Sequence, residues 1–183
     1  MYLINVNETM RFYGGVKTRS RNKVKALPQE EEKKGLPSSN VSPFVVLKDH
    51  RVIAVVGASK NPEKDAHTVP LYLKAHGYRV VPINPTVGEL FEEKTYPSLL
   101  DMPPEVAKQI EVVDVFRPKE ELPEIAKQVV ELKKRVGKTP VFWAQVDLEN
   151  EEAKRILLEN DIPYIMNMCM RATHQLGAQR GHF

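Results

Sequence analysis

The sequence predicts an α/β fold, with a doubly wound parallel sheet of about five strands in a single domain. Five short apolar runs, rich in Val and Ile, recur along the chain, and segments with helical features separate them. The first run, residues 52–56, enters a glycine turn, Gly57-Ala58-Ser59-Lys60, and a helical segment follows. The runs are continuous rather than alternating, which is typical of parallel strands that are buried on both faces.

The first half of the chain begins with a short apolar run from Phe44 to Leu47, which we interpret as the end of a leading helix. After the first strand, Thr68 is a good N-cap and Pro70 is tolerated in the first turn of a helix. We therefore place the start of the next helix near Thr68 and its end at Gly77. The following elements are a strand at 79–83, a turn or one helical turn at 86–91, an extended piece at 94–97, and a helical turn at 98–101 that ends at Pro103-Pro104.

The second half of the chain carries the longest predicted helix, roughly residues 121–136. Its apolar residues recur at three- and four-residue spacing, with Glu near the N-terminal end and Lys or Arg near the C-terminal end. The remaining predicted elements are strands at 111–116, 140–143 and 163–166, a helix at about 149–159, and a short helix after Cys169. This order of strands and helices is that of a Rossmann-like fold.

Right-handed crossovers place the carboxyl ends of the strands at one edge of the sheet, where ligands bind in such folds. Polar and small residues gather at this edge, and the glycine turn lets a ligand approach the backbone. The predicted helix start adds His67 and Thr68 as further candidate contacts for a phosphate. The edge residues are Gly57, Ala58, Ser59, Lys60, Asn84, Pro85, Phe116, Arg117 and Gln145.

A nicotinamide or flavin dinucleotide is the first ligand to consider for this fold. The glycine turn does not have the Gly-x-Gly-x-x-Gly pattern of dinucleotide sites. In such sites an acidic residue at the end of the second strand binds the ribose hydroxyls, whereas this chain has Asn84-Pro85 there. A neutral strand end suits a ribose that carries a phosphate, for which Lys60, Lys64 and Arg117 supply positive charge. An NAD(P)-dependent oxidoreductase therefore stays as an alternative that the second strand end disfavours.

Composition narrows the class of protein further. The 183 residues contain one cysteine, Cys169, which excludes an internal disulfide and fits a reducing cytoplasm. No apolar run approaches the roughly 18 residues of a membrane span, so we expect a cytoplasmic protein without a membrane partner. No metal site is indicated.

The net charge of +3 is unevenly distributed along the chain. Residues 1–45 hold eight Lys or Arg and four Glu, a balance of +4, so the rest of the chain carries −1. We expect residues 1–43 to form a mobile basic arm and residues 44–183 to form the domain. The nearly neutral domain argues against nucleic acid as its main partner. The arm is open to three interpretations: a solvated tail, a weak nucleic-acid or partner contact, and a transit peptide.

Several short motifs occur together in a fixed order. They are Val55-Val56-Gly57-Ala58-Ser59-x-Asn61-Pro62-Glu63, His76-Gly77-Tyr78-Arg79-Val80-x-Pro82-x-Asn84-Pro85, Tyr96-Pro97-Ser98-Leu99 and Val112-Val113-Asp114-Val115-Phe116-Arg117. Over about residues 44–176 the chain resembles the small stand-alone CoA-binding proteins, which are similar to the CoA-binding domain of the succinyl-CoA synthetase α-subunit. The resemblance implies a nucleotide-binding domain for coenzyme A or an acyl-CoA.

By the family pattern, the turn on the pyrophosphate side is Gly57 to Lys60, and the next two loops contribute Asn84-Pro85 and Phe116-Arg117. The resemblance also implies a protein partner in acyl-CoA metabolism. It is weaker at the C-terminal end, where Gln145, Cys169 and His174 match the family pattern but a glycine, an arginine and a glutamate do not. We identify no catalytic residue, since a cysteine just past a buried strand is usually part of the core. A protein-interaction module with a vestigial nucleotide site is the remaining alternative.

Overall fold

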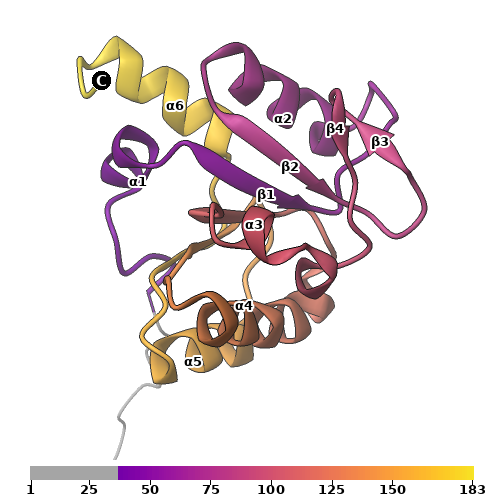
Figure 1. The fold of residues 1–183 in the computed structure, drawn as a ribbon. Helices are drawn as coiled ribbons and strands as arrows, with labels where there is room; N and C mark the ends of the chain where they lie inside the picture. Colours follow the sequence, from indigo (N-terminus) through magenta and orange to yellow (C-terminus); the bar gives the residue numbers. More distant parts are fainter. Residues whose placement is uncertain (1–36) are drawn as a thin grey trace, which may run out of the picture. The chain divides into compact units, whose positions relative to one another are not determined.

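The computed structural model describes residues 37–183, which fold around a central five-stranded parallel sheet (Figure 1). The strand order is β2-β1-β5-β6-β7, and every neighbouring pair is parallel. The predicted fold class is thus confirmed. The strands are β1 (Val52–Val56), β2 (Arg79–Ile83), β5 (Val112–Val115), β6 (Val141–Ala144) and β7 (Tyr164–Ile165).

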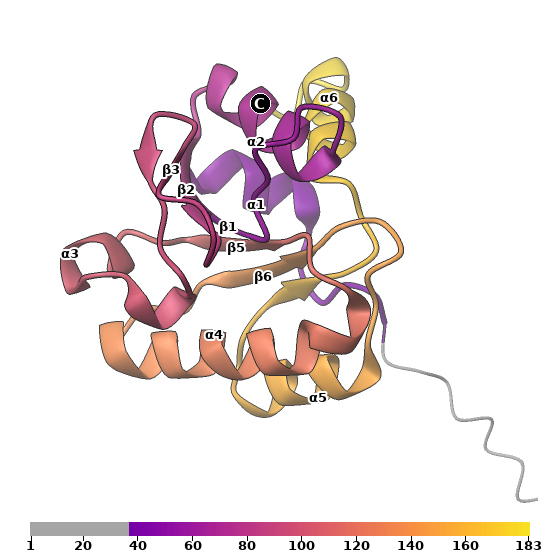
Figure 2. The same cartoon turned by 90° about the vertical axis from the view of Figure 1, so that its right-hand side faces the viewer.

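Helices cover both faces of the sheet, as expected for a doubly wound fold. One face carries α1 (Pro43–Asp49), α2 (Asp65–Ala75) and α6 (Met170–Gln179), and the other carries α4 (Leu122–Val136) and α5 (Glu151–Glu159) (Figure 2). No helix within residues 37–183 combines the length and apolar composition that a membrane span requires.

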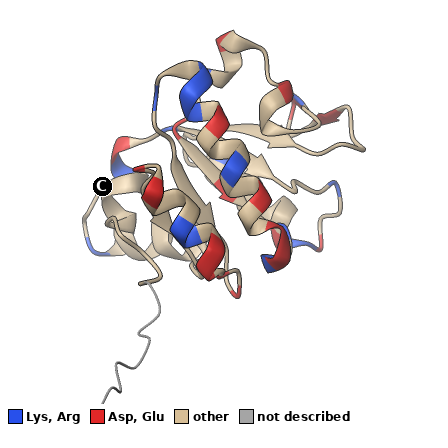
Figure 3. Ribbon diagram, turned by 90° about the horizontal axis from the view of Figure 1, so that it is seen from below, with Lys and Arg blue, Asp and Glu red and all other residues tan. Residues whose placement is uncertain are grey.

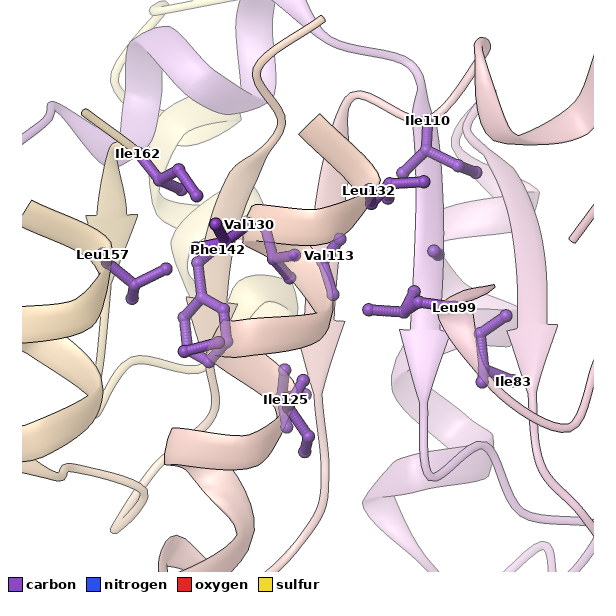
Figure 4. Packing of buried hydrophobic residues seen from close by; sticks show 14 of the residues in the cluster. Ile83, Leu99, Ile110, Val113, Ile125, Val130, Leu132, Phe142, Leu157 and Ile162 are labelled. Atoms are coloured by element: carbon purple, nitrogen blue, oxygen red, sulfur yellow. The ribbon is translucent and has the colours of Figure 1, made fainter. Parts of the chain in front are cut away.

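Each face of the sheet has its own hydrophobic core. The core under α4 and α5 includes Val113 of β5, Phe142 of β6 and Leu157 of α5, whose side chains point into the space between sheet and helices (Figure 4). The core on the α2 side includes Ile53, Val55 and Trp143. Phe142 and Trp143 are fully buried, so these aromatic side chains belong to the core rather than to a stacking platform.

Acidic and basic residues alternate along α4 and α5, as the view of these two helices shows (Figure 3). Two pairs on α4 illustrate the pattern, Lys127 with Glu124 and Lys134 with Glu131, at N···O distances of 3.7 and 3.9 Å. This side of the described domain therefore presents mixed charge and lacks the continuous basic stripe that nucleic acid would need.

The start of α2 differs from the prediction. The helix begins at Asp65 rather than near Thr68, so Pro70 lies in its second turn. A proline there has no N–H to donate to the carbonyl four residues earlier, which is that of Ala66. The amide of Ser59 donates to the Ala66 oxygen instead, at 3.0 Å. The contact of Ser59 with the helix thus supplies the hydrogen bond that Pro70 removes, and this compensation was not visible in the sequence.

The segment between β2 and β5 contains two elements that the sequence did not predict. Residues 89–94 form an antiparallel hairpin of β3 (Glu89–Leu90) and β4 (Glu93–Lys94), where we expected a turn or one helical turn. Its turn places Phe91 and Glu92 at φ of 56° and 60°. Phe and Glu rarely adopt this left-handed conformation, so the residue types do not predict the turn. Further on, η1 (Leu99–Asp101) is followed by the short helix α3 (Pro104–Ala107), with Pro104 at its first position.

The other predicted strands and helices are found within two residues of their expected ends, with η2 (Lys119–Glu121) leading into α4. The expected arm, residues 1–43, lies largely outside the described residues. Its last part, residues 37–42, is hydrogen-bonded to the edge strand β7. Met166 donates its amide to the Ser38 carbonyl at 2.7 Å, and Tyr164 donates its amide to Asn40 Oδ1 at 2.8 Å. In the described chain, the packed structure therefore begins before residue 44.

Candidate ligand-binding site

The carboxyl ends of the central strands lie level with one another at one edge of the sheet. Val56, the last residue of β1, pairs with Ile83 of β2 and with Val115 of β5, and Val115 pairs in turn with Ala144 of β6. The loops that follow these strands therefore start side by side. The chain leaves β1 toward β2 on one side and returns to β5 on the other, which makes the β1–β5 boundary the switch point of the sheet.

Two cavities open at this edge. One has a volume of about 290 Å³ and lies between the ends of β1 and β2, the Pro97-Ser98 segment and α4. The other has a volume of about 360 Å³ and lies over the glycine turn and the loop after β2. Gly57, Asn84, Thr86 and Arg117 line both cavities, so the two are adjoining parts of one site. Eight of the ten predicted contacts line it: Gly57, Ala58, Ser59, Lys60, Asn84, Pro85, Phe116 and Arg117.

The glycine turn is shaped by a close approach to the loop after β5. Gly57 has φ of +86°, and a Cβ at this position would lie 2.9 Å from Cδ of Arg117. Its amide donates to the Ile83 carbonyl at 3.0 Å, while that of Ser59 points to α2. The amide of Ser59 therefore points inward, toward α2. The other two amides of the turn, those of Ala58 and Lys60, have no hydrogen-bond acceptor within residues 37–183.

Asn84 joins the loop after β1 to the loop after β2. Its Nδ2 donates to the Ala58 carbonyl at 2.8 Å, and its Oδ1 accepts from both the amide and the hydroxyl of Thr86, each at 2.8 Å. The side chain of Asn84 therefore fixes the wall shared by the two cavities. An asparagine performs this role because it has a donor and an acceptor on one side chain.

The charges at the site are mostly positive. Lys60 and Lys64 line the larger cavity, and neither forms an ion pair within the described part of the chain. Arg117 borders both cavities and pairs with Glu121, its Nε and Nη2 lying 2.9 and 2.8 Å from the two carboxylate oxygens. Such an arrangement favours a ligand that carries several negative charges.

His67 and Thr68 support the site from outside the cavities. His67 Nδ1 lies 2.7 Å from the Ser59 carbonyl, which ties α2 to the glycine turn. Thr68 Oγ1 accepts from Arg171 of α6 at 3.3 Å. Neither residue lines either cavity, so the structure separates them from the other eight predicted contacts.

Sequence reasoning missed the cavity wall that α4 and the Pro97-Ser98 segment provide. Pro97 and Ser98 lie inside a quoted motif, which could have marked them. Gln128 lines the cavity one helical turn after Ile125, and it is a polar residue beside the apolar stripe of α4. That position was a usable signal, because a polar side chain on a buried helix face usually meets a partner or a cavity.

Gln145, which we placed at the sheet edge, is buried and lies between β5 and α6. Its Nε2 donates to Asp114 Oδ1 at 2.7 Å, and its Oε1 accepts from the amide of Met170 at 3.3 Å. Burial raises the pKa of Asp114 to about 7, against the opposing effects of hydrogen bonds from Gln145 and the Val115 backbone. Gln145 therefore links two elements and lines neither cavity.

Cys169 and His174 have different surroundings in the described chain, and no hydrogen bond joins their side chains there. Cys169 is the residue before α6 and packs against the core on the α2 side. His174 is buried among aromatic rings, and its Nδ1 lies 2.9 Å from the hydroxyl of Tyr72. Burial, together with the neighbouring His76 and Arg51, lowers the pKa of His174.

Comparison with known proteins identifies the family of this chain. The model of a protein family described as "CoA binding domain" matches residues 51–175, which is more than half of the chain. The chain belongs to the CoA binding domain family. The match includes every edge residue described above. The resemblance found in the sequence is thereby confirmed.

Three known proteins are similar to this chain over different shares of their own length. The protein YneT of Bacillus subtilis is 37% identical over 129 residues, covering 70% of this chain and 89% of its own. A solved structure from Thermus thermophilus, cell-free ID.343, is 36% identical with a TM-score of 0.63, covering 72% of this chain and 92% of its own. A 56-residue segment, 30% of this chain, is 39% identical to the ADP-forming acetate–CoA ligase II of Archaeoglobus fulgidus, but it spans 8% of that enzyme.

Proposed function

We propose that this protein binds coenzyme A or an acyl-CoA at the carboxyl edge of its parallel sheet and catalyses no reaction itself. The observation that carries the proposal is the pair of adjoining cavities at the switch point, which share Gly57, Asn84 and Arg117. The family relationship supports coenzyme A as the ligand class.

The chemistry of the site suits the phosphates of this ligand. Lys60, Lys64 and Arg117 supply the positive charge, and the amides of Ala58 and Lys60 are the donors in the glycine turn without a partner in the described chain. Asn84 at the end of β2 is neutral, whereas an NAD site uses a carboxylate there to hold the ribose hydroxyls. The cavity walls of Ile83, Pro97 and Ile125 offer apolar surface for the rest of the ligand.

The biological role that we propose is to hold coenzyme A for a partner enzyme of acyl-CoA metabolism in the cytoplasm. A segment similar to part of an acetate–CoA ligase supports this, since that enzyme carries a related sequence within a much longer chain. The basic N-terminal arm, residues 1–43, is a candidate for contact with such a partner.

Mass spectrometry of the purified protein under native conditions tests the ligand class without choosing it in advance. We expect a retained mass equal to coenzyme A or to an acyl-CoA, released on denaturation. A retained NAD or NADP would instead favour the oxidoreductase alternative and would overturn the proposal.

A further inference from the structure

The ion pair between Arg117 and Glu121 stands at the junction of the two cavities. Arg117 lines both cavities, and Glu121 lines the smaller one. The side chains are 47% and 43% exposed, so both reach solvent and any ligand that enters the site. The stem of Arg117 passes over the turn at Gly57, because Cδ lies 2.9 Å from the position that a Cβ would take there.

Glu121 is the single carboxylate among the described residues that line these cavities, whereas Lys60, Lys64 and Arg117 all line them as cations. The two oxygens of Glu121 occupy the guanidinium of Arg117 in the bidentate geometry that a phosphate also adopts. A phosphate that approaches Arg117 therefore meets a negative charge already in the position it would take.

We propose that Glu121 is an affinity-determining residue: its carboxylate competes with the ligand's phosphates for Arg117, and ligand binding transfers Arg117 from Glu121 to a phosphate. The inference rests on the proposed function. It adds to that function the contact that determines the affinity for the anion. The ligand class is a nucleotide with phosphate groups, of which coenzyme A is the member tested.

The exchange is energetically accessible because the pair is exposed. An exposed ion pair contributes little net stability, since water and salt screen it. Breaking it to pair Arg117 with a phosphate therefore costs little, but this cost is subtracted from the free energy of binding and disappears when Glu121 no longer holds Arg117. Removing the charge of Glu121 should strengthen binding.

The test compares Glu121→Gln with Glu120→Gln by calorimetric titration of coenzyme A into the 183-residue chain at physiological salt. The two changes remove the same charge from neighbouring residues of η2, but Glu120 lines neither cavity and has no ion pair within residues 37–183. We expect E121Q to raise the affinity by about two- to fivefold and E120Q to leave it nearly unchanged. An unchanged or lowered affinity in E121Q would overturn the inference, as would an equal gain in both variants.

A double-mutant cycle decides whether Glu121 acts through Arg117. We expect Arg117→Gln to weaken coenzyme A binding by about tenfold, the loss of one charged pair. In that background, E121Q should produce no further gain. A gain as large as in the parent would mean that Glu121 acts through the general field of the site, which contradicts the inference.

The outcomes also separate the inference from the proposed function. Binding of coenzyme A by the parent without a gain in E121Q would overturn the inference alone. If neither the parent nor any variant binds coenzyme A, both the inference and the proposed function are overturned.

Discussion

Gly57 lines both cavities and has a backbone conformation that a side chain would disturb. Its φ of +86° is costly for any residue with a side chain, and the space where a Cβ would lie is taken by Arg117 and the Phe116 backbone. Gly77, at the end of α2, has nearly the same φ of +87°, but a Cβ there would meet no atom within 4 Å. Comparing substitutions at the two glycines therefore distinguishes the cost of backbone strain from the effect of crowding at the site.

We expect Gly57→Ala and Gly77→Ala both to lower the free energy of unfolding by about 1–2 kcal/mol, the cost of a left-handed residue with a Cβ. Only G57A displaces Arg117, so only G57A should also weaken coenzyme A binding, by about tenfold. Urea unfolding and calorimetric titration of both variants check this. Equal affinities in the two variants would show that the contact of Gly57 with Arg117 is unimportant for the ligand.

Asp114 makes the stability of the protein depend on pH. Its pKa in the folded protein is about 7, above the ordinary value of 3.8, so the folded state retains a proton that the unfolded chain releases. The contribution of Asp114 to the free energy of unfolding is therefore complete below about pH 4. It is lost at about 1.4 kcal/mol per pH unit as the pH rises toward 7.

The Asp114→Asn variant removes this titration while it keeps an oxygen that accepts from Gln145. We expect the parent to lose stability relative to D114N between about pH 4 and pH 7, as measured by urea unfolding at several pH values. The comparison uses the difference between the two proteins because His174, whose pKa is lowered, titrates with the opposite sign in part of this range. Parallel pH profiles would contradict the assignment of a raised pKa to Asp114.

At the level of elements, strands were easier to predict than the loops that form the site. The buried parallel strands are continuous apolar runs, such as residues 52–56 and 79–83, and both were located correctly. The start of α2 was misplaced because Pro70 lies inside the helix only with the help of the hydrogen bond from Ser59 to Ala66, a contact between the loop and the helix that helical periodicity does not predict. The hairpin at 89–94 was missed because its turn uses Phe91 and Glu92 at positive φ.

The residues of the candidate site that directly follow a strand could be predicted. The residues that lie on a helix could not, because their inclusion depends on which face of the helix points to the cavity. The residues after β1, β2 and β5 line the cavities as expected, since parallel strands bring their carboxyl ends to one edge. Gln128 was missed because its inclusion requires the packing of α4 over that edge. Thr68 lies outside both cavities, and its hydroxyl accepts from Arg171 of α6, which lies 103 residues later in the chain.

Asn84→Asp tests the connection between the two loops. The substitution replaces the amide that donates to the Ala58 carbonyl by a carboxylate oxygen that repels it. We expect a loss of about 1 kcal/mol in the free energy of unfolding, as for one broken hydrogen bond at a partly buried position. Since a carboxylate at this strand end also repels a ribose that carries a phosphate, coenzyme A should lose more affinity than dephospho-coenzyme A in a calorimetric titration. Equal losses for the two ligands would mean that Asn84 acts through loop geometry alone and does not face the ribose phosphate.

At the level of the whole molecule, the segment just before α1 is part of the packed structure, which its composition did not indicate. Residues 37–42 look like a polar linker, yet they hydrogen-bond to Tyr164 and Met166 and cover the edge strand β7. We expect deletion of residues 1–36 to leave the melting temperature and coenzyme A binding unchanged. Deletion of residues 1–42 should lower the free energy of unfolding by about 2–4 kcal/mol, because it removes several hydrogen bonds at about 1 kcal/mol each. Equal stability of the two truncated proteins would contradict the packing seen at β7.

The central claim is that the carboxyl edge of this sheet takes coenzyme A rather than a nicotinamide dinucleotide. Calorimetric titration of coenzyme A, NAD and NADP into the ligand-free 183-residue chain tests it most directly. We predict saturable binding of one coenzyme A per chain, a loss of affinity in R117Q, and no binding of NAD or NADP under the same conditions. Saturable binding of NAD or NADP without binding of coenzyme A would contradict the claim.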